Sequence, residues 1–304
     1  MAYAHTFSDF TQQINLTQYA AHLGYEIDRK KTTKSSIVMR KDGDKIIVSR
    51  KGAKWVYFSV TDDSDNGTIV NFIGNRTHKS IAEIGRELSA WLGGGVSYPS
   101  PKNYVQEIEE HVYDPERIKR VFHYCKPNLN DAYLEQRGLT RALLRDERFT
   151  GRIFKDRYHN AVFPHYGRKG ICGLELKSFE KNFFVKGSEK TLWRSNIKQA
   201  DDCLIIGEAV IDTLSYHQLF NSEKAFYFAT GGGMSPEQGE ILKDFIAGFK
   251  ALKQIIIITD NDQGGDKLTV KIKSVIAEAS ARVKVTRHSP EMRGADWNNV
   301  LNSR

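Results

Sequence analysis

The stretch Ile255-Ile256-Ile257-Ile258-Thr259-Asp260-Asn261-Asp262-Gln263-Gly264-Gly265-Asp266 decides the fold of this chain. Four consecutive isoleucines make a short, β-branched and fully apolar run, which is typical of a strand buried on both faces of a parallel sheet. The run ends abruptly in acids and a glycine pair. Ligands collect at the carboxyl ends of strands in open α/β sheets, so these acids lie where chemistry is usually done.

Asp260 and Asp262 are two residues apart, and a loop that leaves the strand can direct both carboxylates towards one point. Two hard oxygen donors suit Mg²⁺, which binds one or two carboxylates and keeps most of its waters. The alternative is that the segment is simply a polar turn, because its residue types also dominate turns. Both interpretations stay open on this motif alone.

A second apolar run ends in an acid in the same way. Residues 203–206 lead through a glycine into Glu208, and a predicted helix then carries Asp212 one turn later. Between the two acidic ends, residues 226–229 form another short apolar run that leads into three glycines. This repeated strand–helix pattern predicts a parallel sheet with right-handed crossovers.

The order of these motifs resembles the Toprim domain, which bacterial primases, topoisomerases, some repair proteins and some nucleases share. In that family a glutamate at the first strand end and an Asp-x-Asp pair at a later one coordinate Mg²⁺. The resemblance covers residues 200–304. It implies catalytic residues that bind Mg²⁺ or Mn²⁺, namely Glu208, Asp260 and Asp262, with Asp212 and Asp266 as weaker candidates for a second metal ion.

Length, charge and cysteine content limit the class of protein. A chain of 304 residues is long enough for two or three domains with real cores. A formal charge of +8 points to a polyanionic partner such as nucleic acid, although a basic surface can also be merely solvating. The three cysteines are far apart and show no disulfide or zinc spacing, so we expect a cytoplasmic protein. Without a long apolar span or a signal peptide, we expect no membrane association.

Residues 1–92 are predicted to form a small β-rich module. Its expected elements are a helix, three alternating strands and two helices, over residues 7–23, 36–40, 45–49, 55–59, 68–72 and 81–92. The order resembles the zinc-binding module at the start of bacterial primases. No Cys or His lies at the ligand positions of its two turns, so we expect this module to fold without zinc.

Lys54 and Trp55 are candidate nucleic-acid contacts in this module, because a ring set among cations can stack on bases and hold phosphates. The alternative is that Trp55 and Tyr57 share the core face of their strand. We expect at least one of these rings to be core, since a small module needs large residues to bury.

Residues 93–103 are rich in Gly, Ser and Pro and are predicted to be a linker. Residues 104–199 then carry four notable segments, Tyr133-Leu134-Glu135-Gln136-Arg137-Gly138-Leu139, Asn160-Ala161-Val162-Phe163-Pro164, Gly173-Leu174-Glu175-Leu176-Lys177 and Lys190-Thr191-Leu192-Trp193-Arg194-Ser195. Together they resemble the mixed α+β basic subdomain that precedes Toprim in bacterial primases. Where the family has Gly-Gly-Arg, this chain has Leu174-Glu175-Leu176-Lys177, which leaves the register of Lys177 open.

This second resemblance implies contacts with template or nucleotide phosphates by Arg137, Lys177, Lys190 and Arg194. Each of the first three also has a structural interpretation: Arg137 at the last carbonyls of its helix, Lys177 on the polar face of a strand, and Lys190 as a loop charge. His159 and His165 are assigned no role.

The segment Gly294-Ala295-Asp296-Trp297-Asn298-Asn299-Val300-Leu301 resembles the tail of Toprim proteins encoded on plasmids and other mobile elements. We expect Asp296 to cap the last helix. The expected fold is α/β, with a parallel, Rossmann-like Toprim sheet preceded by α+β parts.

The implied function is that of a DNA primase-like nucleotidyltransferase, which makes short primers on single-stranded DNA from nucleoside triphosphates. A helicase or relaxase of the same mobile element is an expected partner. Two alternatives remain, a metal-dependent Toprim nuclease and a non-catalytic single-stranded DNA-binding protein.

Overall fold

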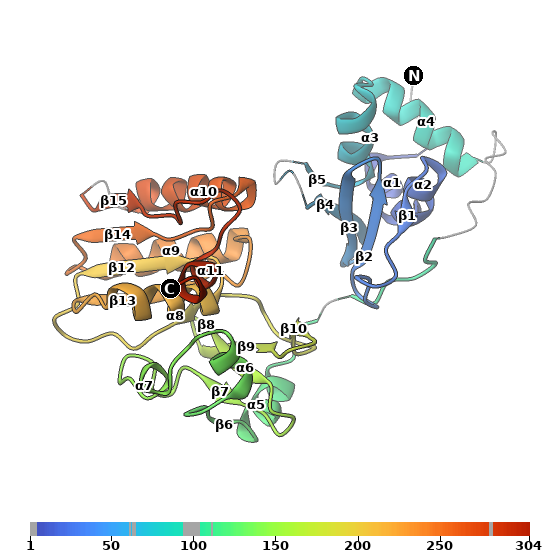
Figure 1. The fold of residues 1–304 in the computed structure, drawn as a ribbon. Helices are drawn as coiled ribbons and strands as arrows, with labels where there is room; N and C mark the ends of the chain where they lie inside the picture. The colour runs from blue at the N-terminus through green and yellow to red at the C-terminus, as the bar shows by residue number, and fades with distance from the viewer. Residues whose placement is uncertain (1–4, 61, 63–64, 94–103, 111, 280–281) are drawn as a thin grey trace. The chain divides into compact units, whose positions relative to one another are not determined.

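The computed structural model describes residues 5–60, 62, 65–93, 104–110, 112–279 and 282–304 (Figure 1). Its contacts divide the chain into two compact units, Met1–Val112 and Tyr113–Arg304. The linker predicted over residues 93–103 lies, apart from Gly93, outside the described residues. In the described ranges, none of the helices has the length and apolarity that a membrane crossing requires.

The first unit is an antiparallel five-stranded sheet with helices packed on it. The strands follow one another in the order β1 (Glu26–Ile27), β2 (Ile37–Lys41), β3 (Asp44–Lys51), β4 (Lys54–Ser59) and β5 (Asn66–Gly67). The helices are α1 (Phe7–Gln13), α2 (Leu16–His22), α3 (Ile69–Thr77) and α4 (Ile81–Gly93). One apolar core joins the sheet to these helices, with Tyr19, Tyr57 and Phe72 among its fully buried members.

Two local features of this unit differ from the sequence expectation. The helix predicted over residues 7–23 is two helices, because Asn15 interrupts the first and caps the second by accepting hydrogen bonds from the backbone N–H groups of Thr17 and Gln18. Residues 104–110, expected in the middle part of the chain, pack on this unit instead. Thr17, for example, donates a 2.9 Å hydrogen bond to the carbonyl of Val105.

A partly buried ion network ties α3 to the sheet. Arg76 Nη2 lies 2.8 Å from Asp44 Oδ2 and 2.7 Å from Asp65 Oδ2. The hydroxyl groups of Tyr25 and Tyr57 donate to the same two carboxylates. The network joins the start of β3, the segment before β5 and α3, and so cross-links the module through charge and hydrogen bonds.

The second unit begins with an antiparallel sheet in the order β10-β9-β8-β7-β6. Its strands are β6 (Lys126–Pro127), β7 (Phe154–Lys155), β8 (Ala161–Gly167), β9 (Gly170–Lys177) and β10 (Asn182–Phe184). The helices of this half are α5 (Pro115–His123), α6 (Ala132–Gln136) and α7 (Arg141–Leu144). The backbone of Tyr166 bridges to Leu192, which connects this sheet to the next one.

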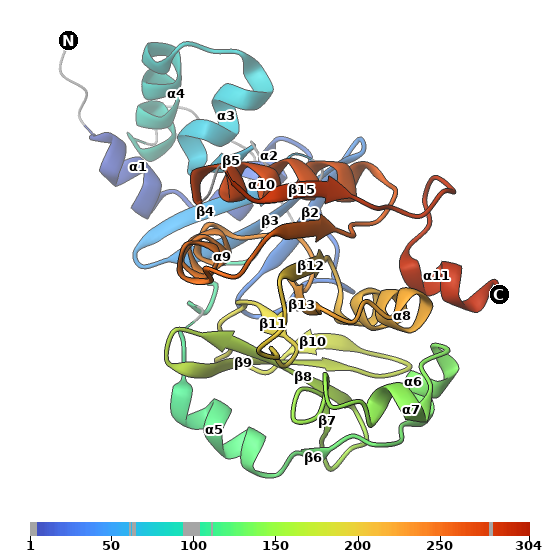
Figure 2. The same ribbon diagram turned by 90° about the vertical axis from the view of Figure 1, so that its left-hand side faces the viewer.

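The last part of the chain forms a mostly parallel sheet in the order β11-β13-β12-β14-β15. Its elements are β11 (Trp193–Arg194), β12 (Cys203–Gly207), α8 (Val210–Phe220), β13 (Ala225–Ala229), α9 (Pro236–Gly248), β14 (Gln254–Ile257), α10 (Gln263–Ala279), β15 (Lys284–Arg287) and α11 (Trp297–Asn302). Helices α9 and α10 cover one face and α8 with α11 the other (Figure 2). Strand β11 runs antiparallel to its neighbour, and the other strands of this sheet pair in parallel. The predicted fold class is confirmed.

Candidate active site

The two acidic strand ends lie side by side. Strands β12 and β14 are parallel neighbours with Ile206 opposite Ile257, so Glu208 and Asp260 leave the sheet at the same edge. The chain goes from β12 to β13 on one side and then crosses to β14 on the other. This reversal creates the crevice at which open α/β sheets bind ligands.

The Asp-x-Asp loop is shaped by a close approach of helix and strand. Asp262 Oδ1 accepts a 2.7 Å hydrogen bond from the backbone N–H of Gly265 and so caps the first turn of α10. A Cβ atom at Gly265 would lie 2.0 Å from the carbonyl oxygen of Asp260. The segment therefore does form a polar turn, and this turn brings Asp260 and Asp262 to the sheet edge.

The carboxylates at this edge repel one another. Burial, together with the charges of Asp212, Glu208, Asp296 and Asp262, raises the pKa of Asp260 to about 8. Burial and the charge of Asp262 raise the pKa of Glu208, and two nearby lysines oppose that rise. Asp260 Oδ1 is buried without a hydrogen-bond partner, an arrangement that calls for a ligand in a native protein.

These observations bear on whether a metal ion fits. In the ranges the structure describes, no three Asp, Glu, His or Cys side chains converge closely enough to hold one. All the candidate ligands are nevertheless carboxylates. A hard divalent cation would bind the unpaired oxygen of Asp260 and reduce the repulsion between these negative charges. The chemistry of Glu208, Asp260 and Asp262 fits Mg²⁺ or Mn²⁺.

The other acids of the sequence prediction are engaged differently. Asp212 is 6% exposed, accepts a 3.1 Å hydrogen bond from the backbone N–H of Asn298, and has its pKa raised to about 7 by burial and by Asp296. Asp296 caps α11, as expected.

Asp266, in contrast, is held by two guanidinium groups, 2.6 Å from Arg287 and 2.8 Å from Arg293. Its prediction as a second-metal ligand is not supported, because two ion pairs already occupy its carboxylate.

Two lysines of the antiparallel half reach the acidic edge. Lys190 donates a 2.9 Å hydrogen bond from Nζ to the carbonyl of Gly233, in the glycine loop after β13. Lys177 lies at the end of β9 and is 8% exposed, so it is not on a solvated strand face. The positive charges of both lysines act on Glu208. Both lysines are therefore near enough to Glu208 for their charges to act on it, and their contact with phosphates stays a prediction.

Lys177 forms a buried ion pair with Glu175, which in turn lies close to His165, and this pair was not predicted from the sequence. Glu175 Oε1 lies 3.2 Å from Lys177 Nζ, and Glu175 Oε2 lies 3.7 Å from His165 Nε2. His165 is fully buried, and its Nδ1 is 2.8 Å from the carbonyl oxygen of Thr191. Burial acts to raise the pKa of Glu175, but His165 and Lys177 outweigh it, and the net pKa is lowered.

A signal for this pair is present in the sequence. The alternation in residues 174–177 places Glu175 and Lys177 on one face of a strand.

The two predicted arginines occupy different places. The charge of Arg137 acts on Asp212, and its backbone carbonyl accepts a 2.6 Å hydrogen bond from Asn298 Nδ2. The Arg194 guanidinium lies 5.1 Å from the centre of the Tyr166 ring, and Arg152 lies 4.8 Å from the same ring. Burial and the charge of Arg152 lower the pKa of Arg194. Arg137 therefore lies beside the acids, whereas Arg194 belongs to a cation pair with Arg152.

The two candidate nucleic-acid contacts of the first unit, Trp55 and Lys54, also lie in different environments, one buried and one exposed. Trp55 is 5% exposed in the core, and the Arg50 guanidinium lies 4.9 Å from the centre of its ring. Its prediction as a base-stacking residue is wrong, because Trp55 and Tyr57 are both buried on the core face of β4. Lys54 is exposed.

Comparison with protein families gives two matches. Residues 205–301 match the Toprim-like family, and residues 132–200 match a family described as a protein of unknown function (DUF3991). No curated protein matches the chain. The Toprim-like match confirms the family predicted for the last part of the chain, and the mobile-element type stays a prediction.

Solved structures to which the chain is similar include primases. A DNA primase domain from Pseudomonas aeruginosa is 16% identical, with a TM-score of 0.36, over 57% of this chain and 59% of that one. The primase fragment of the bacteriophage T7 primase-helicase protein is 18% identical, with a TM-score of 0.43, over 69% and 84%. The Aquifex aeolicus primase, with its zinc-binding and RNA polymerase domains, is 16% identical, with a TM-score of 0.40, over 97% and 81%.

Proposed function

We propose that this chain is a divalent-metal-dependent nucleotidyltransferase that makes short primers on single-stranded DNA from nucleoside triphosphates. The observation that carries the proposal is the meeting of opposite charges at one sheet edge. Glu208 and Asp260 leave neighbouring strands there, and the charges of Lys177 and Lys190, from the other half of the same unit, act on Glu208. Acids beside cations suit a substrate that brings both phosphates and a divalent ion.

Different residues would bind the metal ion and the phosphates. Glu208, Asp260 and Asp262 would hold the metal ion, which when bound neutralises a triphosphate and lowers the pKa of an attacking 3′-hydroxyl. Lys190 and Lys177 would attract the phosphates, with Lys177 fixed by Glu175. The loop at Gly231–Gly233 has positive φ at its first two residues, and the N–H of Gly232 donates a 3.0 Å hydrogen bond to the carbonyl of Glu208, which holds this loop beside the predicted catalytic acid.

The test is an assay with single-stranded DNA, labelled nucleotides and Mg²⁺ or Mn²⁺. We expect short labelled oligonucleotides from the wild type and none from Asp260→Asn. The matched control is Asp266→Asn, which changes the same motif at a carboxylate held by two arginines and is expected to keep synthesis. Thermal unfolding of both variants checks that the fold persists.

Other products separate the alternatives. Shortened template means that the same acids activate water, as in a Toprim nuclease. A mobility shift without any product means a single-strand binder. Synthesis retained by Asp260→Asn contradicts the metal assignment. A helicase or relaxase partner stays a prediction. A role in the replication of a plasmid or other mobile element, which rests on the resemblance of residues 294–301, also stays a prediction.

A further inference from the structure

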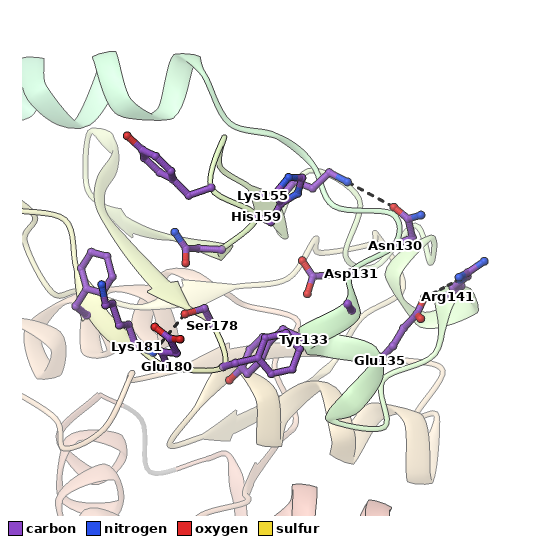
Figure 3. A pocket seen from close by; sticks show the side chains of 15 residues that line it. Asn130, Asp131, Tyr133, Glu135, Arg141, Lys155, His159, Ser178, Glu180 and Lys181 are labelled. Atoms are coloured by element: carbon purple, nitrogen blue, oxygen red, sulfur yellow. Dashed lines mark hydrogen bonds and ion pairs between the residues drawn. The ribbon is translucent and has the colours of Figure 1, made fainter.

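A cleft of about 900 Å³ lies in the antiparallel half of the second unit, and none of the predicted catalytic acids lines it (Figure 3). Three segments form its walls: residues 130–135 around the start of α6, residues 155–160 between β7 and β8, and residues 178–183 between β9 and β10. In Figure 3, Tyr133, the Ser178–Lys181 turn and the pair Lys155 and His159 lie on different sides of the opening. The volume is within the range of ligand sites.

Aromatic rings line this cleft and remain in solvent. Tyr158 is 68% exposed, Phe179 is 62% exposed and Phe183 is 42% exposed. Phe179 contacts the Tyr133 ring edge to face, with the ring centres 5.5 Å apart. Arg157 covers one side of Tyr158 at 4.8 Å from the ring centre. Exposed rings gathered at one concave place mark a binding surface rather than a core.

Two lining cations of the cleft are available to contact an anionic ligand. Among the described residues, neither Lys155 nor Lys181 forms an ion pair, and Lys126 stands directly opposite Lys155 across the β6–β7 ladder. Two of the three lining acids are already engaged. Asp131 accepts hydrogen bonds from Leu134 N–H and Asn128 Nδ2, and Glu135 binds Arg141 at 2.7 Å. The third acid is Glu180.

The cleft is next to the acidic edge through Tyr133. This ring lines the cleft, and its hydroxyl group responds to the charges of Arg137, Glu175 and Asp212. Arg137 follows directly after α6, so one short helix carries both the cleft wall and the cation beside Asp212.

We propose that this cleft holds unpaired bases of the single-stranded template, which stack on Phe179 and Tyr158 while Lys155 and Lys181 contact the adjoining phosphates. A ring face accepts any base, so the site binds without sequence preference. The proposal rests on the proposed function for its substrate, and it adds a second binding site that is separate from the catalytic acids.

The test measures binding of a fluorescent single-stranded oligonucleotide by anisotropy, without nucleotides, for the full chain and for Phe179→Ala and Tyr158→Ala. The matched control is Tyr124→Ala, because Tyr124 is 71% exposed in the same half but lies outside the cleft. Each cleft variant is expected to weaken binding by roughly tenfold, the effect of losing one stacked base, and the control is expected to bind normally.

A second probe separates stacking from structural damage. With an oligonucleotide that carries abasic sites, phosphates remain but bases are gone, so the cleft variants and the wild type are expected to bind alike. Equal weakening on both probes, or normal binding by the cleft variants, overturns the proposal while the proposed function stands. A wild type that does not bind single-stranded DNA overturns both.

Discussion

Glu175 Oε1 lies 3.2 Å from Lys177 Nζ on β9, and the two side chains are 3% and 9% exposed. Burying both charges is tolerable only because each compensates the other, and because His165 lies on the far side of Glu175. This pair holds one of the two lysines at the predicted catalytic glutamate. Its removal therefore affects stability and phosphate binding together.

Glu175→Gln is expected to lower the free energy of unfolding by about 3–5 kcal/mol, because Lys177 keeps its buried charge without a partner. Glu116→Gln removes the exposed pair between Glu116 and Lys119 and is expected to leave the free energy of unfolding nearly unchanged. Denaturant unfolding of both variants measures the difference. Equal effects would show that the β9 pair contributes no more than a surface contact.

Gly265→Ala is expected to displace the Asp260 loop, because the added Cβ would lie 2.0 Å from the carbonyl oxygen of Asp260. Relieving this clash requires a shift of the backbone, which costs more free energy than a change of side-chain rotamer. The variant should lose the increase in melting temperature that Mg²⁺ or Mn²⁺ gives the wild type.

Gly248→Ala is the control for this change. It places a methyl group at the end of α9 with nothing within 4 Å. A full metal response in Gly265→Ala would contradict the tight packing of α10 on this loop.

Arg194→Gln is expected to reduce the salt dependence of single-stranded DNA binding. Arg194 and Arg152 flank Tyr166, and no carboxylate in the described residues pairs with either guanidinium. Removing one phosphate-binding cation lowers the slope of log K against log salt by about 0.7. Arg117→Gln, on the exposed side of α5, serves as the comparison. An unchanged slope would place Arg194 outside the DNA path.

Arg76→Leu is expected to loosen the first unit locally. Asp44 and Asp65 lose their shared guanidinium, which costs on the order of 3 kcal/mol when the carboxylates stay partly buried. Hydrogen exchange of the full chain should show faster exchange over residues 5–93 and unchanged exchange in the second unit. Arg86→Leu, at an exposed position of α4, should leave both units protected.

The same network sets a pH dependence with a definite sign. Burial acts to raise the pKa of Asp65, but hydrogen bonds from Arg76, Asn75 and Tyr57 outweigh it, so the folded pKa lies below 3.8. Its stabilising effect is therefore present above pH 3.8 and is lost as the pH falls through the lower folded value. The stability difference between wild type and Arg76→Leu should shrink in acid. A difference that grows there would contradict the assignment.

Local sequence was enough to predict much of this molecule. Four isoleucines before Asp260, and the apolar run before Glu208, specify buried strands that end in acids, since strand burial and turn chemistry depend on near neighbours. The cap at Asp296 was predictable for the same reason. Parallel β-strands joined by helices leave few possible topologies, so the meeting of Glu208 and Asp260 at one edge also followed.

Tertiary structure alone decided which charged and aromatic side chains face each other. Trp55 is core because β4 turns that face inward, and Asp266 is paired because β15 and the segment after it bring Arg287 and Arg293 to it. The charges of Lys177 and Lys190 act on Glu208 only because the tertiary fold brings residues 177 and 190 near the end of β12. Such contacts join residues far apart in the chain. Their energies depend on burial and distance, which no local pattern of residues encodes.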